Sequence, residues 1–117
     1  MAENPLLTIV LRYRILIVMK VNEFFSSFIK IHILHHCLKE EIYGAWMMEE
    51  LKEHGYTISP GSLYPLLRSL EQKGLITSRE DQEGKIKRKY YRITSKGKKE
   101  LLEAKQKLKE LIGEILE

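Results

Sequence analysis

A single cysteine, Cys37, occurs among the 117 residues. Because one cysteine cannot form an internal disulfide, the sequence does not support a disulfide-stapled secreted fold, and the reducing cytoplasm is the expected location. Cys37 is left as a candidate redox sensor. The chain is long enough for one hydrophobic core and too short for two ordinary domains, so we expect one compact domain with appendages.

The sequence also lacks the patterns on which common catalytic sites depend. It contains no nucleophile elbow, no glycine-rich phosphate-binding loop and no visible arrangement of Ser, His and Asp. The acidic pairs Glu40-Glu41 and Glu49-Glu50 are typical of solvated helix surfaces. We therefore predict that the protein is not an enzyme and has no cofactor.

The apolar run from Pro5 to Met19 is too short to span a bilayer. It carries Arg12 and Arg14 in its middle and lacks the small-residue cleavage site of a signal peptide, so we expect no membrane association. Residues 1–22 are predicted to be an N-terminal extension. They form either an extra helix or strand that packs on the body or on a second subunit, or a misassigned start.

Two segments before residue 52 show apolar residues at helical spacing. The first contains Phe24, Phe28, Ile31, Leu34 and Leu38, and the second contains Met47, Met48 and Leu51. This spacing predicts a helix from Phe24 to Leu38 that faces a core with that stripe. After a short polar loop, it predicts a second helix from Ala45 to Leu51 that ends before Gly55.

A third helix is indicated by Leu63, Leu66, Leu67 and Leu70. It follows Ser59-Pro60-Gly61-Ser62, in which a hydroxyl can cap the helix and the proline suits its first turn. Gly74 closes it. Just before this helix, Tyr56-Thr57-Ile58 has the composition of a strand.

The remaining sequence predicts a hairpin and one long helix. Leu75 to Arg79 and Lys89 to Ile93 are expected to be strands, separated by a flexible polar tip at 80–85. Thr94 or Ser95 then caps a helix with a possible dimerisation seam. The seam consists of Leu101, Ala104, Leu108, Leu111 and Ile115.

Three helices, a hairpin and a final helix follow one another in the order of a winged helix. The predicted fold is therefore mainly α (α+β), a winged helix-turn-helix with a two-stranded wing and a long C-terminal dimerisation helix. We divide the chain into the extension at 1–22, a DNA-binding domain at 23–94 and a dimerisation helix at 95–117.

Basic residues gather in the second half of the hairpin and the start of the last helix. Between Gly84 and Lys99 the sequence has no acidic residue and carries Lys85, Lys87, Arg88, Lys89, Arg92, Lys96, Lys98 and Lys99. Together with Tyr90 and Tyr91, this cluster suits the neutralisation of nucleic-acid phosphates. A solvated surface is the alternative interpretation.

The third helix presents polar groups on the side away from its leucines: Ser59, Ser62, Tyr64, Arg68, Ser69 and Lys73. In a helix-turn-helix, residues near the start of this helix reach the major groove of duplex DNA. The predicted DNA-binding residues are Ser59, Ser62, Tyr64, Arg68, Lys73, Lys85, Lys87, Arg88, Lys89 and Tyr90. For Tyr64, a half-buried core aromatic is the alternative.

The same residues resemble a known family. The run Pro60-Gly61-Ser62-Leu63-Tyr64-Pro65, followed by Leu67, Leu70, Glu71 and Gly74-Leu75-Ile76, is similar to the signature of the PadR-like regulators. Arg88-Lys89-Tyr90-Tyr91 with Ile93, Thr94 and Gly97 resembles the wing of that family, and Tyr43-Gly44 matches the position before helix two. The resemblance covers about residues 24–117.

By that resemblance the protein is a homodimeric repressor that acts on a palindromic operator in double-stranded DNA. The C-terminal helix forms the dimer, the third helix and wing contact DNA, and the single C-terminal helix places the chain in the shorter branch of the family. A small-molecule effector at the dimer interface stays open, because no residue pattern identifies one. Ala45 stands where the family has an aromatic, and Trp46 follows it.

Two other functions are compatible with the sequence. The cluster of His32, His35, His36 and Cys37, with His54 farther on, suggests a metal-sensing regulator, since His32 and His36 share a helix face. The cluster lacks acidic partners at metal-site spacing, so we assign no metal-binding residues. A winged helix that binds RNA or another protein is the second alternative.

Overall fold

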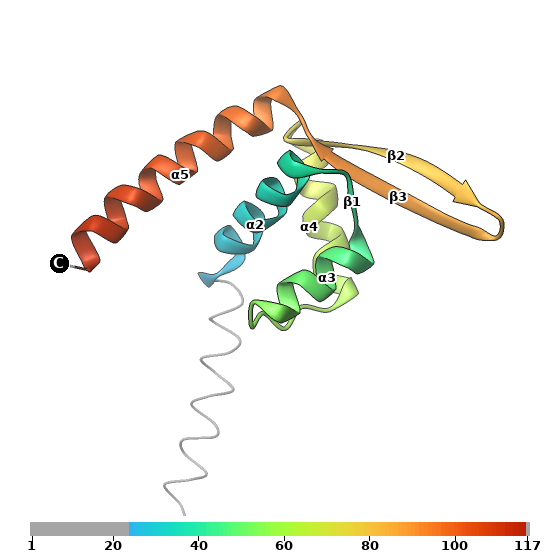
Figure 1. Cartoon of the computed structure of the whole chain (residues 1–117), viewed down its shortest axis with the longest axis horizontal. Helices are drawn as coiled ribbons and strands as arrows, with labels where there is room; N and C mark the ends of the chain where they lie inside the picture. Colours follow the sequence, from blue (N-terminus) through green and yellow to red (C-terminus); the bar gives the residue numbers. More distant parts are fainter. Residues whose placement is uncertain (1–23, 117) are drawn as a thin grey trace, which may run out of the picture.

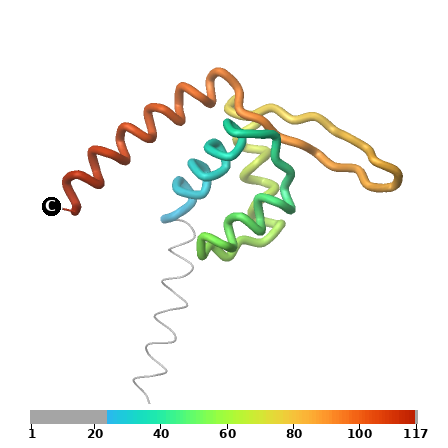
Figure 2. The backbone as a smooth tube through the Cα atoms, in the orientation of Figure 1, coloured from blue at the N-terminus to red at the C-terminus, as the bar shows by residue number. Residues whose placement is uncertain are grey.

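The computed structural model describes residues 24–116 (Figure 1). Its elements are α2 (Ser26–Lys39), β1 (Ile42–Tyr43), α3 (Gly44–Glu53), α4 (Pro60–Gln72), β2 (Ile76–Glu83), β3 (Ile86–Ile93) and α5 (Ser95–Ile115). Helices α2, α3 and α4 form one body, and the β2–β3 hairpin and α5 leave that body in opposite directions (Figure 2). This order confirms the predicted winged helix. The predicted extension at 1–22 lies outside the described residues.

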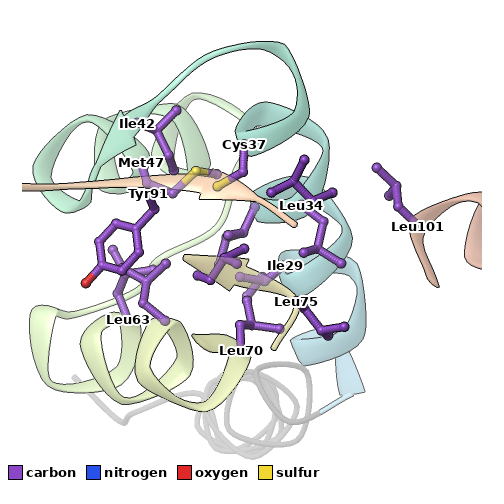
Figure 3. Close-up of a cluster of buried hydrophobic side chains, with 14 of the residues drawn as sticks. Ile29, Leu34, Cys37, Ile42, Met47, Leu63, Leu70, Leu75, Tyr91 and Leu101 are labelled. Carbon is purple, nitrogen blue, oxygen red and sulfur yellow. The ribbon is translucent and has the colours of Figure 1, made fainter. Parts of the chain in front are cut away.

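The core lies where the three helices meet the base of the sheet (Figure 3). Leu63 and Leu67 of α4 are fully buried, as are Met47 and Leu51 of α3. Tyr91 of β3 adds an aromatic ring to the cluster. Each large apolar side chain buried in this way stabilises the folded state by about 1.5–3 kcal/mol relative to an exposed one. The side of α4 that carries the leucines therefore faces the core.

Helix α2 turns a different face to the core than its sequence pattern predicts. The buried residues are Ile29, Ile33, Leu34 and Cys37. Of the predicted stripe only Leu34 is buried, while Phe24 and Leu38 are exposed. The prediction was wrong because α2 has apolar residues around most of its circumference, so periodicity alone does not identify its inner side.

The short strand β1 was not predicted, and the predicted strand at 56–58 does not form. Ile42 lies opposite Tyr91 and Tyr43 lies opposite Tyr90, which gives a three-stranded antiparallel sheet in the order β1-β3-β2. A two-residue strand exists only because β3 supplies its partner, so it has no sequence signal of its own. Residues 56–58 instead connect α3 to α4 without regular structure.

The wing is longer than predicted. Glu80 to Glu83 belong to β2 rather than to a flexible tip, and only Gly84 and Lys85 form the turn. Gly84 has φ +60°, as the first central residue of a type II′ hairpin requires. Opposite charges stabilise this outer part of the hairpin: Glu80 lies opposite Lys89 and forms an ion pair with Lys87 at 3.0 Å.

Polar contacts fix the two junctions of the hairpin and the start of α4. Thr94 caps α5, since its Oγ1 accepts a hydrogen bond from the Gly97 amide at 3.0 Å and donates one to the Gly74 carbonyl at 2.5 Å. Ser59 occupies the N-cap position of α4, but its side chain makes no capping bond. Its hydroxyl donates to Ser62 Oγ at 3.3 Å instead, which corrects the predicted hydroxyl cap.

Helix α5 packs on the body only near its beginning. Leu101 is buried in the core of its own chain, whereas Leu111, Ile112 and Ile115 near the other end are exposed. None of the helices within residues 24–116 combines the length and apolarity that crossing a membrane demands.

The approach of α5 to the body depends on Gly97. A Cβ at this position would overlap the carbonyl oxygen of Leu75 and lie 2.7 Å from Ile93 Cγ1. We predict that Gly97→Ala lowers the free energy of unfolding by about 1–3 kcal/mol, because backbone must shift to accept the methyl group. The control is Gly113→Ala on the same helix, where nothing lies within 4 Å. It should be neutral or stabilise the protein. Equal thermal transitions for the two variants would contradict this packing.

Candidate nucleic-acid interface

Helix α4 places most of its predicted contact residues on one exposed surface. The exposed residues are Ser59, Ser62, Tyr64 and Arg68. Leu63 and Leu67 between them are buried. Lys73 is also exposed but stands at the C-cap, at the opposite end of the helix from Ser59. At 1.5 Å per residue this end lies roughly 15–20 Å from the serines, so Lys73 does not join their surface.

Tyr64 lies against the beginning of α3. A Cβ on Gly44 would come within 2.7 Å of Tyr64 Cε1 and 2.8 Å of its hydroxyl oxygen. The ring therefore occupies the space that any side chain at position 44 would need. Since Tyr64 is still 43% exposed, it combines a packing contact on one face with an accessible hydroxyl-bearing surface. The environment of Tyr64 is therefore compatible with a DNA contact through its exposed part and with a packing role for its buried part.

The predicted basic residues of the wing do not share one face. Side chains alternate along a strand, so Lys87 and Lys89 point to the same side as buried Tyr91, and Arg88 points to the other. On the inner side, Lys87 Nζ lies 3.0 Å from Glu80 Oε2, and Lys89 Nζ lies 3.7 Å from Glu71 Oε1. Carboxylates therefore partly neutralise two of the predicted phosphate-binding groups.

The outer side of the sheet carries a row of aromatic rings and guanidinium groups. The guanidinium of Arg88 lies 4.6 Å from the centre of the Tyr43 ring, and that ring meets Tyr90 edge to face at 5.7 Å. Arg79 covers the far side at 4.9 Å from the Tyr90 ring and donates through Nε to Glu41 Oε2 at 2.7 Å. These contacts hold Arg88 in place.

Sequence reasoning assigned no contact role to Tyr43 or Arg79. Their part in the row depends on the pairing of β1 with β3 and on the register of β2, and neither leaves a local pattern in the sequence. The one sequence feature that pointed to Tyr43 was the Tyr43-Gly44 pair, which matches the position before helix two in the PadR-like regulators.

A cleft of about 450 Å³ separates the helices from the wing. Its residues come from the end of β1, the start of α3, α4 and the free edge of β3: Tyr43, Gly44, Ala45, Tyr64, Ile86, Lys87, Arg88 and Lys89. β1 pairs with β3 only at positions 90 and 91, so residues 86–89 leave this edge of the sheet open. The cleft joins a helix N-terminus with three basic residues, a combination that suits an anionic chain.

The predicted dimerisation residues fall into two groups. Leu101 is buried within its own chain, and Ala104 and Leu108 are partly buried. Leu111 and Ile115 are exposed together with Ile112 and Leu116. The exposed apolar surface of α5 therefore lies in its last turns, beyond the part that packs on α2.

Cys37 lies in the core with 2% of its surface exposed. Burial raises the pKa of its thiol to about 12, so almost none of it is the reactive thiolate near pH 7. The structure therefore does not favour the redox sensor suggested by the sequence.

Three of the four histidines, His32, His36 and His54, lie between α2 and the end of α3. His36 Nε2 and His54 Nε2 each lie 3.2 Å from Glu50 Oε1, and the rings of His32 and His54 are 5.0 Å apart. Burial, followed by the neighbouring His54 and His36, lowers the pKa of His32 below its ordinary value of 6.5. Within residues 24–116, no three His, Cys, Asp or Glu side chains have the arrangement of a metal site. The metal-sensing alternative gains no support here.

Comparison with known proteins identifies the family of this fold and cleft. The transcriptional regulator PadR-like family matches residues 33–104, which include α3, α4, the whole wing and the start of α5. The chain is 42% identical over 96 residues to transcriptional regulator Rv3488 of Mycobacterium tuberculosis, covering 82% of this chain and 90% of that protein.

Solved structures agree. A PadR family transcriptional regulator from Eggerthella lenta matches with a TM-score of 0.75 and 34% identity, covering 92% of this chain and 97% of that one. A PadR-like transcriptional regulator from Bacillus cereus matches with a TM-score of 0.69 and 32% identity, covering 81% and 97%. The winged helix is thus that of a DNA-binding regulator and not of an enzyme, and the chain belongs to the PadR-like family of transcriptional regulators.

Proposed function

We propose that this regulator is a repressor that binds a palindromic operator as a homodimer. In each chain, residues 23–94 form the DNA-binding unit and residues 95–117 form the dimerisation helix. Helix α4 enters the major groove, and the wing lies along the adjacent minor groove. Occupation of a promoter by the dimer blocks transcription.

The cleft between the helices and the wing is the observation that carries this proposal. In duplex DNA a single sugar-phosphate backbone separates a major groove from the neighbouring minor groove. A protein that places α4 in one groove and the wing in the other must therefore accept that backbone between them. The 450 Å³ cleft stands at this position, and its lining is basic.

The groups around the cleft match the chemistry of a phosphate. Arg88 lies over Tyr43. Asp81 on the facing strand pairs with Arg79 at 3.4 Å instead, so no described carboxylate forms an ion pair with Arg88. Its guanidinium is therefore available to an anion. The first amides of α3, at Gly44 and Ala45, carry the partial positive charge of a helix N-terminus, and no acidic residue occupies its first turn. Lys85 in the turn extends the positive charge to the tip of the wing.

Helix α4 supplies the groups that meet the bases and the flanking phosphates. Ser59 and Ser62 lie at its exposed beginning, the end that enters the major groove in helix-turn-helix proteins. Tyr64 and Arg68 follow on the exposed side, about one turn apart. We assign Ser62 and Arg68 to contacts that position the helix on the backbone, and the hydroxyl of Tyr64 to the boundary between helix and cleft.

The exposed apolar end of α5 supports the dimer. Leu111, Ile112 and Ile115 lie on consecutive turns and are each about half or more exposed in the single chain. Pairing with a second copy about a twofold axis buries them and places two α4 helices on one side of a duplex. When the helices meet successive major grooves, the half-site centres lie about 34 Å apart. A small molecule that binds between the chains and changes this spacing releases the operator.

One prediction of this proposal concerns the wing. Arg88→Ala should weaken binding to operator and scrambled duplexes alike. It should also flatten the dependence of log K on log salt by about 1.8 for the dimer, because each of the two chains loses one phosphate contact worth about 0.9. Fluorescence anisotropy at several salt concentrations measures the affinity and its salt dependence. The control is Lys107→Ala on α5, which removes a similar charge from an exposed site far along the chain. An unchanged slope for Arg88→Ala would remove this side chain from the backbone contacts.

Another prediction of this proposal concerns the dimer. Leu108→Lys with Leu111→Lys should give monomers in sedimentation, since the seam would then bury like charges. Operator affinity should fall roughly 100-fold or more, because each chain holds one half-site without its tethered partner. Leu102→Lys is the control, since Leu102 is exposed on the opposite side of α5. A double variant that still dimerises would place the interface elsewhere.

The proposal as a whole is tested by anisotropy on duplexes from upstream of the protein's own gene. We expect tight, salt-dependent binding to a palindromic sequence, with weaker binding to scrambled duplex and to RNA. Inserting five base pairs between the half-sites should abolish the tight binding, because half a helical turn rotates one half-site to the opposite face of the DNA. Equal weak binding to every nucleic acid would contradict a sequence-specific repressor.

A further inference from the structure

Glu71 occupies the last turn of α4, directly beside the base of the wing. One carboxylate oxygen, Oε2, accepts a hydrogen bond from the Ser78 hydroxyl of β2 at 2.5 Å. The other oxygen, Oε1, lies 3.7 Å from the ammonium group of Lys89 on β3. A single side chain of α4 thus contacts both strands of the hairpin.

These two contacts connect elements that otherwise meet through apolar packing. Within residues 24–116, every side-chain hydrogen bond or ion pair between α4 and the strands β2 and β3 ends on Glu71. The other polar contacts at this end of α4 go to Thr94 and Lys96, beyond the hairpin. Directional contacts fix an angle in a way that apolar packing does not, because a hydrogen bond weakens steeply when its geometry departs from the optimum.

Ser78, which Glu71 contacts, lies where the wing leaves the body of the protein. Ser78 lies opposite Tyr91, the last buried residue before the hairpin extends into solvent. Beyond this pair both strands are exposed as far as the turn, apart from the partly buried Tyr90. A small change of angle at Ser78 is therefore carried along the whole length of the wing.

We propose that Glu71 is a positioning residue that sets the angle between α4 and the wing, and with it the width of the cleft between them. This inference rests on the proposed function, in which α4 and the wing straddle one phosphate backbone. Glu71 itself touches no DNA. It acts through Ser78 and Lys89, and its effect is greatest on a duplex that engages both elements at once.

An electrostatic role for Glu71 makes the opposite prediction. A carboxylate near a phosphate backbone repels it and also occupies Lys89, so a purely electrostatic Glu71 lowers the affinity for every duplex. Removing its charge would then tighten all binding. A positioning role instead predicts that Glu71→Ala weakens the operator complex selectively, because scrambled duplexes do not require the two elements to engage in register.

The test uses the full-length protein with Glu71→Ala, Glu71→Gln and Ser78→Ala. The glutamine keeps an oxygen that accepts from Ser78 and loses only the exposed contact to Lys89, which contributes little. Glu53→Gln is the control, because it removes the same charge from an exposed site at the end of α3. Affinity for operator and scrambled duplex is measured by anisotropy, and the thermal transition reports folding.

We expect Glu71→Ala and Ser78→Ala to lower operator affinity about tenfold, as befits one lost hydrogen bond to a charged group, with scrambled-duplex affinity nearly constant. Glu71→Gln should restore most of the loss. If Glu71→Ala fails to fold, Ser78→Ala still tests the proposal, because it removes the same hydrogen bond from the serine side. Tighter binding of all duplexes by both Glu71 variants would overturn the proposal, as would an unchanged operator affinity.

A second measurement separates this inference from the proposed function. Hydrogen exchange in the free protein should speed up in the amides of β2 and β3 in Glu71→Ala and not in Glu53→Gln, since the wing loses its directional contact with α4. If the wild-type protein shows no operator preference, the proposed function fails while this result still tests Glu71. Unchanged exchange in the wing would overturn the positioning role.

Discussion

The burial of β3 in the core that α2 and α4 form with it is the constraint on which the rest of the structure depends. Tyr91 and Ile93 are buried, so strand alternation turns Arg88 and Tyr90 to the opposite face and leaves Lys87 and Lys89 on the inner one. The same packing brings β1 alongside β3 and sets the start of α3 beside the wing. The cleft, the aromatic row and the open edge of β3 all follow from this single register.

Two small features turn this framework into a site. Gly44 lacks a side chain, which allows Tyr64 to lie directly against the start of α3, where both residues line the cleft. On the other wall, Arg88 lies over the Tyr43 ring, and this contact favours one position of the guanidinium. A regulator that binds DNA through preordered groups loses less conformational entropy when the complex forms.

The helices α3 and α4, the wing and the family could be predicted from sequence, because leucine spacing, glycine stops and the motif near Tyr64 are local signals. The inner face of α2 could not, since Ile29 and Ile33 compete with equally apolar neighbours. Strand β1 and the full length of the wing depend on cross-strand partners. The role of Tyr43 and the contacts of Glu71 come from residues far apart in the sequence, so no local pattern indicates them. Which residues contact DNA and form the dimer stays a prediction.

Ethylation interference on the operator tests the central claim most directly, since it finds the phosphates whose modification blocks binding. If one backbone runs between α4 and the wing, the strongest interference should fall on the phosphates that separate each major-groove half-site from its neighbouring minor groove. Arg88→Ala should reduce the interference at those same phosphates. Interference limited to phosphates on the far side of the half-site, with none at the groove boundary, would mean that the cleft holds no DNA.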